Sequence, residues 1–178
     1  MSTNSIAFAN GKGGVGKTSV AANVAGIAAL SGWRVLAVDL DPQGNLGNDL
    51  GYEQRGLSDD GAGLMAAIRD GLPLNLLREV RPSLDVARGG EQLDGLLEIL
   101  APRLVDDSQP ITAIAEVLAP VAGDYDLVVL DCPPVGGGVL EAILTASRFL
   151  VIPTKRDLGS LRGLVRVARS FARVRMGD

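Results

Sequence analysis

The stretch Asn10–Ser19, NGKGGVGKTS, follows the short apolar run Ser5–Ala9 (SIAFA) and precedes an alanine-rich segment. Its spacing matches G-x-x-x-x-G-K-[ST], the pattern of a phosphate-binding loop, at Gly11, Gly16, Lys17 and Thr18. Such a loop lies between a buried strand and the start of a helix, and the flanking residues have that character. We therefore predict that this stretch binds the phosphates of a nucleotide.

The residues of the loop have separate expected roles. Its backbone N–H groups converge on phosphate oxygens, and the N-terminus of the following helix adds partial positive charge. Lys17 is expected to reach the β- and γ-phosphates, and Thr18 to offer its hydroxyl to Mg²⁺. The alternative is a glycine-rich turn without a ligand. The predicted nucleotide-binding residues are Gly11, Lys12, Gly13, Gly14, Val15, Gly16, Lys17, Thr18 and Ser19.

The rest of the chain alternates between apolar strands and helical segments. Strands are expected at Ser5–Ala9, Arg34–Leu40, Ser83–Arg88, Tyr125–Asp131 and Phe149–Thr154. Helices are expected at Lys17–Ser31, Leu64–Arg69, Gln92–Leu100, Ile111–Val121, Val139–Ala146 and Ser160–Arg175. The strands are continuously apolar, which is typical of a buried parallel sheet. We predict one α/β domain over residues 1–178, with a mostly parallel central sheet and helices on both faces.

The composition excludes several classes of chemistry. The sequence has no histidine, which excludes histidine-based triads and histidine-ligated zinc. Its one cysteine, Cys132, cannot form an internal disulfide or hold an iron–sulfur cluster alone. There is no apolar run of the roughly 18 residues that a membrane span needs, and no signal-peptide pattern. A cytoplasmic protein is the expectation.

Acidic residues stand at the ends of two predicted strands. Asp39 and Asp41 end VLAVDLD, and Asp131 ends LVVLD. The carboxyl ends of parallel strands meet at one edge of a sheet, where ligands of open α/β folds bind. Taken alone, each acid also fits a turn that ends a strand. Together with the phosphate loop, they predict a site for Mg²⁺ and a nucleotide.

Three motifs in combination resemble a known family. KGGVGKTS, DLDPQGN and DCPP look like the deviant Walker A ATPases, and most like the ParA/Soj partition ATPases. The resemblance continues in IPTKRDLGSLRGL, where matching positions are Pro153, Asp157, Leu161, Gly163 and Leu164. The motifs extend over residues 6–164, whereas residues 50–120 are weakly diagnostic.

The resemblance implies roles that the residues alone do not. Lys12 would reach into the nucleotide site of a second subunit in an ATP-dependent homodimer. Without the resemblance, Lys12 would be interpreted as a solvated lysine of the loop. Asp41 would orient the attacking water, and Asp39 would support the Mg²⁺ shell together with Thr18 and Asp131. Ser19 would touch the α-phosphate. Gly136–Gly138 would form a second switch loop, or equally a flexible turn.

The implied function is a slow, partner-stimulated ATPase that segregates plasmids or chromosomes. Such a protein would bind DNA non-specifically as an ATP dimer and act with a ParB-like centromere-binding protein. No stable membrane association is expected. The alternatives are a MinD-like ATPase that positions cell division, or a nucleotide-dependent scaffold with little turnover. Relative to the family, the sequence lacks the usual C-terminal strands and helices, which close the adenine pocket.

Charge is distributed unevenly along the chain. The net charge is −4, yet residues 148–178 hold eight of the 17 basic side chains and two of the 21 acidic ones. In the last helix, apolar positions at helical spacing are Leu161, Leu164, Val165, Ala168, Phe171 and Ala172. A second stripe carries Arg162, Arg166, Arg169 and Arg173. This stripe is either a solvated helix face or a contact for DNA phosphates.

Overall fold

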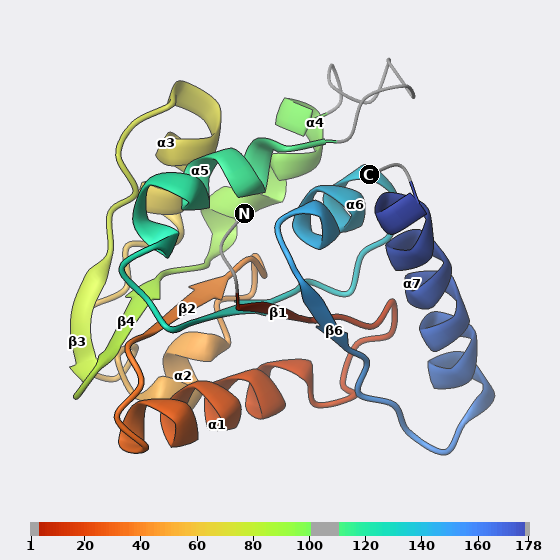
Figure 1. Cartoon of the computed structure of the whole chain (residues 1–178), viewed down its shortest axis with the longest axis horizontal. Helices are drawn as coiled ribbons and strands as arrows, with labels where there is room; N and C mark the ends of the chain where they lie inside the picture. Colours follow the sequence, from red (N-terminus) through yellow and green to blue (C-terminus); the bar gives the residue numbers. More distant parts are fainter. Residues whose placement is uncertain (1–3, 101–110, 177–178) are drawn as a thin grey trace.

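A six-stranded sheet with helices on both faces forms the centre of the molecule, in a computed structural model that describes residues 4–100 and 111–176 (Figure 1). The strands are β1 (Ser5–Phe8), β2 (Val35–Asp39), β3 (Leu77–Arg81), β4 (Leu84–Ala87), β5 (Leu127–Asp131) and β6 (Phe149–Val151). The helices are α1 (Lys17–Leu30), α2 (Leu46–Leu50), α3 (Ala62–Asp70), the 3₁₀ helix η1 (Glu91–Gly95), α4 (Leu96–Leu100), α5 (Ala113–Ala122), α6 (Gly137–Thr145) and α7 (Leu158–Met176).

The strand order is β3-β4-β2-β5-β1-β6, and every neighbouring pair except β3–β4 is parallel. Strands β2 and β5 lie inside the sheet and are buried along their whole length. Continuous apolar sequence suits such strands because helices cover both of their faces. The predicted three-layer α/β fold with a mostly parallel sheet is confirmed.

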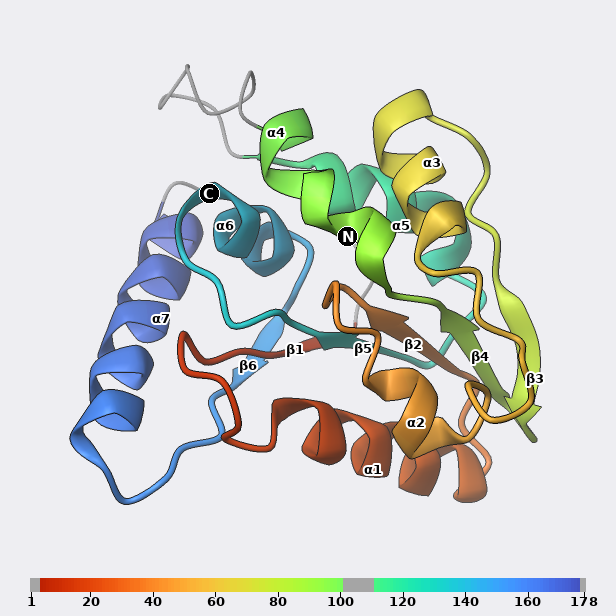
Figure 2. The same ribbon diagram turned by 180° about the vertical axis from the view of Figure 1, so that it is seen from behind.

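The two faces of the sheet pack into separate apolar cores. Helices α1 and α2 cover one face, while α3, α4, α5 and α6 cover the other (Figures 1 and 2). Helix α7 packs against α6, next to the β6 edge. The core between the sheet and helices α1 and α2 is rich in alanine, with Ala21, Ala22 and Ala25 of α1 buried against the sheet. Small side chains let this helix lie close to the strands, which brings its N-terminus to the sheet edge.

Two elements, β3 and α2, were not expected from the sequence. Strand β3 is an edge strand whose sequence is LREVR, and only Val80 in it is buried. It therefore lacks the apolar run by which the other strands are recognised. Helix α2 is five residues long and ends at Gly51, within a region rich in turn residues. Strand β6 ends at Val151, three residues before the predicted boundary, ahead of Pro153. The predicted connection between the helices at 92–100 and 111–121 falls on residues 101–110, outside the described residues.

The apolar spacing of the last helix matches its buried side only in part: Leu164 and Phe171 are partly buried, and Phe171 packs against the core. Of the expected apolar face, Leu161 and Val165 are 50% and 46% exposed, and Ala168 and Ala172 are exposed as well. The buried side of α7 consists of small side chains and one valine, at Ser160, Gly163, Val167 and Ser170. Small residues occupy this buried face because α7 approaches the loop after β1 very closely. A β-carbon at Gly163 would lie 2.1 Å from Oδ1 of Asn10.

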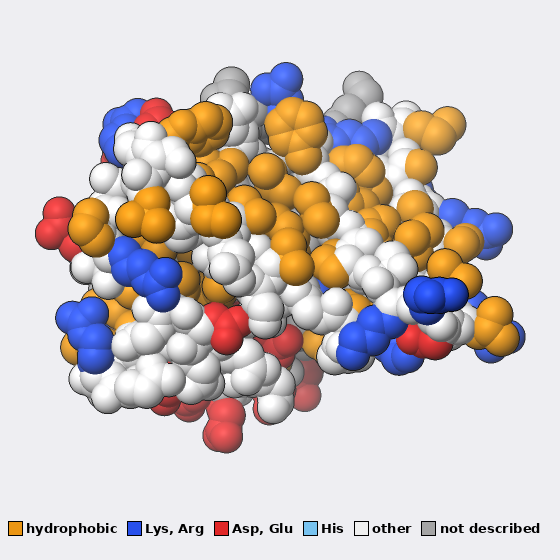
Figure 3. Space-filling view, turned by 90° about the horizontal axis from the view of Figure 1, so that it is seen from below, with side chains coloured by type: hydrophobic (Ala, Val, Ile, Leu, Met, Phe, Trp, Pro, Cys, Tyr) orange, Lys and Arg blue, Asp and Glu red, His pale blue; other side chains and the backbone are white. Residues whose placement is uncertain are grey.

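Apolar side chains remain exposed on the face that carries α1. Figure 3 views the molecule from this side and shows hydrophobic side chains gathered across its middle. Large exposed side chains include Val20 and Ile27 of α1 and Phe149 and Val151 of β6. Among the described residues, the helices are all too short or too polar to serve as a membrane span.

Candidate nucleotide-binding site

Three segments singled out in the sequence meet at one edge of the sheet. Phe8, at the end of β1, pairs with Asp131 at the end of β5, and Asp39, at the end of β2, pairs with the same Asp131. The loop 10–16 continues from β1 and leads directly into α1. The parallel register therefore brings the loop and both strand-end acids together, as the sequence predicted.

The loop after β1 is held in place from its first residue. The Asn10 side chain is buried, donates from Nδ2 to the Pro153 carbonyl oxygen (2.8 Å) and accepts the Lys12 N–H at Oδ1 (3.0 Å). Gly16, the residue before α1, has φ of 89°, a left-handed conformation that favours glycine. The loop thus ends with the first N–H groups of α1 facing the sheet edge. These groups have no partner within the helix and are suited to bind an anion.

A cavity of about 430 Å³ lies over the loop and the start of α1. The predicted binding residues that line it are Gly13, Gly14, Gly16, Lys17, Thr18 and Ser19, and the predicted catalytic Asp41 lines it as well. Gly11, Lys12 and Val15 do not line it. Five lining residues were missed, namely Gln43, Asn45, Asn48, Asp49 and Pro134. The first two belong to the DPQGN motif and could have been found there. The next two lie on α2, which the sequence did not reveal.

Lys17 is buried beneath the cavity, with 6% of its surface exposed. Its Nζ makes one long contact, 3.5 Å, to the Lys12 carbonyl oxygen. A buried ammonium with one weak partner retains most of its capacity to donate. The position suits a lysine that binds phosphate oxygens.

The two strand-end acids differ in how their charge is compensated. Asp39 is fully buried and accepts the N–H groups of Asp41 (3.0 Å) and Leu46 (3.2 Å), one at each carboxylate oxygen. Burial, and next the charge of Asp131, hold the pKa of Asp39 well above its usual range. Asp131 is also fully buried, but neither of its oxygens has a hydrogen-bond partner among the described residues. Burial raises the pKa of Asp131 to about 7, and the charge of Asp41 adds to this, while Thr18 and Lys17 act in the opposite direction.

These residues fit a bound Mg²⁺. A buried carboxylate without partners is costly unless a cation or donors compensate it, and Asp131 is such a group beside Thr18. Within residues 4–100 and 111–176, no three acidic, histidine or cysteine side chains gather into a complete metal cage. Mg²⁺ commonly binds through one or two protein oxygens while waters and substrate phosphates complete its shell. Asp131 and Thr18 would hold such an ion, and Asp39 would support the backbone around it.

Asp41 lies at the wall of the cavity and is 6% exposed. Its backbone N–H is fixed by Asp39, and its own Oδ1 accepts the N–H of Gln43 at 2.9 Å. The second carboxylate oxygen has no recorded hydrogen bond within the described part of the chain. A carboxylate that is oriented by its neighbours and keeps an acceptor facing a cavity can orient a water molecule.

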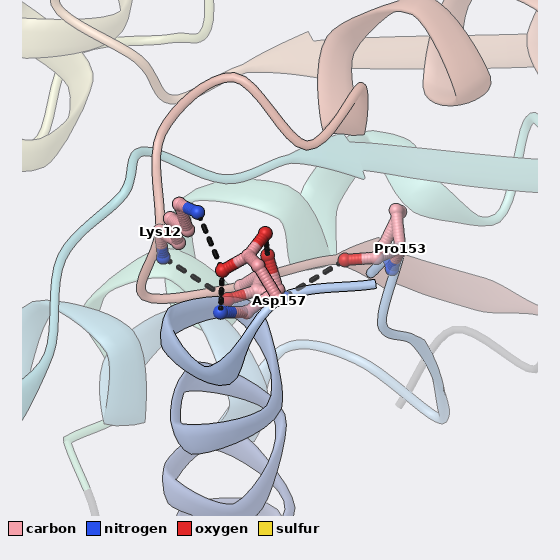
Figure 4. A network of polar contacts seen from close by, with 5 residues as sticks. Lys12, Pro153 and Asp157 are labelled. Carbon is pink, nitrogen blue, oxygen red and sulfur yellow. Dashed lines mark hydrogen bonds and ion pairs between the residues drawn. The ribbon is translucent and has the colours of Figure 1, made fainter. Parts of the chain in front are cut away.

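Lys12 makes an ion pair within its own chain (Figure 4). Its Nζ lies 2.6 Å from Oδ1 of Asp157, at the start of α7, and both side chains are partly exposed. Asp157 also accepts the backbone N–H (2.9 Å) and the hydroxyl (2.8 Å) of Ser160. The bond from Lys12, and next those from Ser160, lower the pKa of Asp157. Lys12 is therefore neither a freely solvated lysine nor, in this single chain, directed into the cavity.

The three consecutive glycines Gly136–Gly138 do not form a separate loop. Gly137 and Gly138 are the first residues of α6, and Gly136 precedes them in an extended conformation. The connection between β5 and α6 is thus limited to residues 132–136, of which Pro134 lines the cavity.

A family model for an AAA domain, AAA_31, matches residues 3–177. The chain belongs to this family. It is 34% identical over 174 residues to the chromosome partitioning protein ParA of Myxococcus xanthus, covering 97% of this chain and 59% of that protein. It is 35% identical over 159 residues to the sporulation initiation inhibitor protein Soj of Bacillus subtilis, covering 89% and 61%. The resemblance to ParA and Soj is confirmed, and this AAA_31 chain spans about three fifths of the length of these relatives.

Solved structures agree on the fold of this AAA_31 chain. Cobyrinic acid a,c-diamide synthase from Mycobacterium smegmatis, solved with ADP and magnesium bound, superposes with a TM-score of 0.80 at 28% identity. That comparison covers 97% of this chain and 67% of the synthase. The apo McdA protein of Cyanothece superposes with a TM-score of 0.84 at 22% identity, covering 97% and 66%, and supports the fold alone.

The electrostatics of Asp131 predict a pH dependence of stability in the absence of nucleotide. Its folded-state pKa, about 7, lies above the 3.8 of an ordinary aspartate. The folded state therefore binds the proton of Asp131 more tightly than the unfolded state does. Protonation thus stabilises the folded protein at low pH, and this stabilisation is lost as pH rises from about 4 to 7. Asp131→Asn removes this titration while keeping the shape of the side chain.

Urea unfolding at pH 4.5 and 7.5 measures the effect. Between these values, the wild-type protein should lose on the order of 3 kcal/mol more stability than Asp131→Asn. Because the charge of Asp131 also raises the pKa of Asp39, the comparison reports the titration of this pair of buried carboxyl groups. Parallel pH profiles for the two proteins would contradict this account of the buried carboxylate.

Proposed function

We propose that the chain binds and hydrolyses ATP as a partition-type ATPase. The observation that carries the proposal is that loop residues, Lys17, Thr18 and Asp41 line one cavity at the sheet edge, with the buried Asp131 beside Thr18. The relatives named for chromosome partitioning support the biological role. The ADP and magnesium bound to the related synthase support the ligand.

Each residue has a task in this proposal. Bound Mg-ATP supplies the scissile γ-phosphoryl group and a cation that neutralises its charge. The loop amides and Lys17 bind the phosphate oxygens, Thr18 and Asp131 hold the metal, and Asp41 orients water for attack on the γ-phosphorus. Hydrolysis breaks the bond between the γ-phosphorus and the bridging oxygen, and yields ADP and phosphate. Slow turnover is expected, because Lys17 is the one cation among the described residues that line the cavity.

A homodimer would provide that second cation. Lys12 stands at the outer side of the loop and is held there by Asp157, with both side chains about two fifths exposed. An exposed ion pair of this kind contributes roughly 0–1 kcal/mol, so it can be exchanged for a contact with phosphate. We propose that Lys12 enters the cavity of a second subunit in the ATP state.

DNA and a ParB-like protein are the proposed partners. Three arginines on the exposed side of α7, namely Arg162, Arg166 and Arg169, form no ion pair with any described carboxylate. Arg173 belongs to the same stripe but pairs with Glu141. Unpaired arginines on one helix face suit the phosphate backbone of DNA, and dimerisation would double the number of contacts.

The first prediction of this function separates binding from hydrolysis. Lys17→Ala should abolish ATP binding, because the buried ammonium beneath the cavity is lost. Asp41→Ala should retain binding within about threefold but lower kcat by about 100-fold, because it acts on water and not on phosphate. Isothermal titration with a slowly hydrolysed ATP analogue and a phosphate-release assay measure the two effects.

Full turnover in Asp41→Ala would remove that residue from the mechanism. Tight binding without turnover in the wild type would favour the scaffold alternative.

The second prediction concerns Lys12. Lys12→Ala should leave the affinity of the monomer for ATP nearly unchanged but prevent the ATP-dependent dimer and lower hydrolysis by at least about tenfold. Lys155→Ala, an exposed lysine of the neighbouring loop, is the control. Sedimentation velocity with and without the ATP analogue distinguishes monomer from dimer. Equal assembly of the Lys12 and Lys155 variants would show that Lys12 is not used between subunits.

The third prediction tests DNA binding. A random duplex should bind in the presence of ATP and dissociate as salt is raised, and replacing Arg162, Arg166 and Arg169 by Ala should weaken binding at least about tenfold and reduce the salt dependence. Arg55→Ala, an exposed arginine of another loop, is the control. Anionic vesicles added in parallel test the MinD-like alternative. Binding to vesicles instead of DNA would replace the partition role with that one.

A further inference from the structure

Gly89 lies directly behind the segment that carries Asp39 and Asp41. It is buried at the C-terminal end of β4, two residues past Ala87. A β-carbon at Gly89 would lie 2.6 Å from Cγ of Asp39 and 2.8 Å from the carbonyl oxygen of Asp41. Contacts this short do not occur, so any side chain at position 89 must displace the carboxylate or the turn.

The contacted groups are the ones that shape the turn. Asp39 accepts the N–H groups of Asp41 and Leu46, and the carbonyl oxygen of Asp41 accepts the N–H of Gly44 at 3.0 Å. Any displacement of the Asp39 carboxylate would therefore also displace the backbone of Asp41. No residue of the loop 11–19 appears among the nearest neighbours of a β-carbon at Gly89.

Gly89 cannot move away from the turn, because the residues beside it are anchored on their other side. Arg88 forms an ion pair with Asp59 at 2.9 Å, with side-chain exposures of 11% and 20%. It also donates to the carbonyl oxygen of Leu57 at 2.9 Å. The N–H of Glu91 is bound by Oδ1 of Asp60 at 2.9 Å. The end of β4 is thus clamped between residues 57–60 and the turn.

We infer that Gly89 is a positioning residue for hydrolysis: the absence of a side chain there lets Asp39 hold Asp41 where it orients water. This inference rests on the proposed ATPase function. Gly89 does not line the cavity, and the three atoms nearest to its β-carbon position belong to Asp39 and Asp41, so its effect should fall on kcat and not on nucleotide affinity. A displacement of about 1 Å in a catalytic group can lower a rate by as much as about 100-fold.

Gly89→Ala is the test, and Gly123→Ala is its matched control. Gly123 lies at the end of α5, and a β-carbon there meets nothing within 4 Å. We expect Gly89→Ala to lower kcat at least about tenfold while the affinity for the ATP analogue changes less than about threefold. Gly123→Ala should leave both unchanged. Retained kcat in Gly89→Ala would overturn the inference, and so would an equal loss of affinity.

A second measurement does not depend on turnover. Hydrogen exchange should be faster at the N–H groups of Asp41 and Leu46 in Gly89→Ala, because both are donated to Asp39, while exchange in β1 stays unchanged. If the wild type binds ATP without hydrolysing it, the proposed function fails, yet this measurement still decides the role of Gly89. Unchanged exchange at both amides would refute that role.

A double variant covers the case in which Gly89→Ala does not fold. Asp39→Ala removes the carboxylate that would be nearest to the new β-carbon. The contact of 2.8 Å with the carbonyl oxygen of Asp41 remains, so the rescue should be partial. The melting temperature should therefore fall less from Asp39→Ala to Asp39→Ala/Gly89→Ala than from the wild type to Gly89→Ala. An equal or larger fall in the double variant would show that Asp39 is not the obstacle and would overturn the inference.

Discussion

The architecture of the site depends on a carboxylate that the protein buries and compensates only in part. Asp131 sits at the end of a fully buried strand and makes no hydrogen bond of good geometry in the described part of the chain, and the nearby Thr18 and Lys17 only partly offset the effect of burial on its pKa. The sheet forces this situation, because the parallel register places Asp131 beside Asp39, and Thr18 in the first turn of α1 lies next to it. A fold made only for stability would place an apolar or paired residue there. The buried carboxylate of Asp131 is thus the feature of the molecule that points most clearly to a bound cation.

Around this charge, the neighbouring groups are fixed by contacts that do not involve a ligand. Asn10 fixes the start of the loop to Pro153, and Asp39 fixes the turn that follows β2. Gly89 supports that turn from behind. Such preorganisation matters for phosphoryl transfer, where catalysis consists largely of placing charges and water. Rigidity comes from hydrogen bonds to the backbone and from close packing.

The sequence predicted the parts of the site that local patterns encode. The loop 10–19 and the strand-end acids Asp39 and Asp131 follow from spacing and from uninterrupted apolar strands. The exposed side of α7, the ion pair of Lys12 and the role of Gly89 could not be predicted, because they depend on close approach between segments far apart in the chain. Lys12 and Asp157 are 145 residues apart. Small residues make such contacts, whereas helical periodicity is recognised from large apolar residues such as Leu161, which lies on the exposed side of α7.

Helix α7 is attached to the phosphate loop by two contacts of very different strength. At Gly163 the helix meets Asn10 so closely that no side chain fits, and this contact is buried and fixed by shape. The pair between Lys12 and Asp157 is partly exposed and contributes at most about 1 kcal/mol. A triphosphate carries more charge than Asp157, so Lys12 can exchange partners at little cost while the Gly163 contact keeps α7 in place. Lys12 can therefore change its partner while the backbone of the loop keeps its geometry, which is what the proposed sharing of the site between two subunits would require.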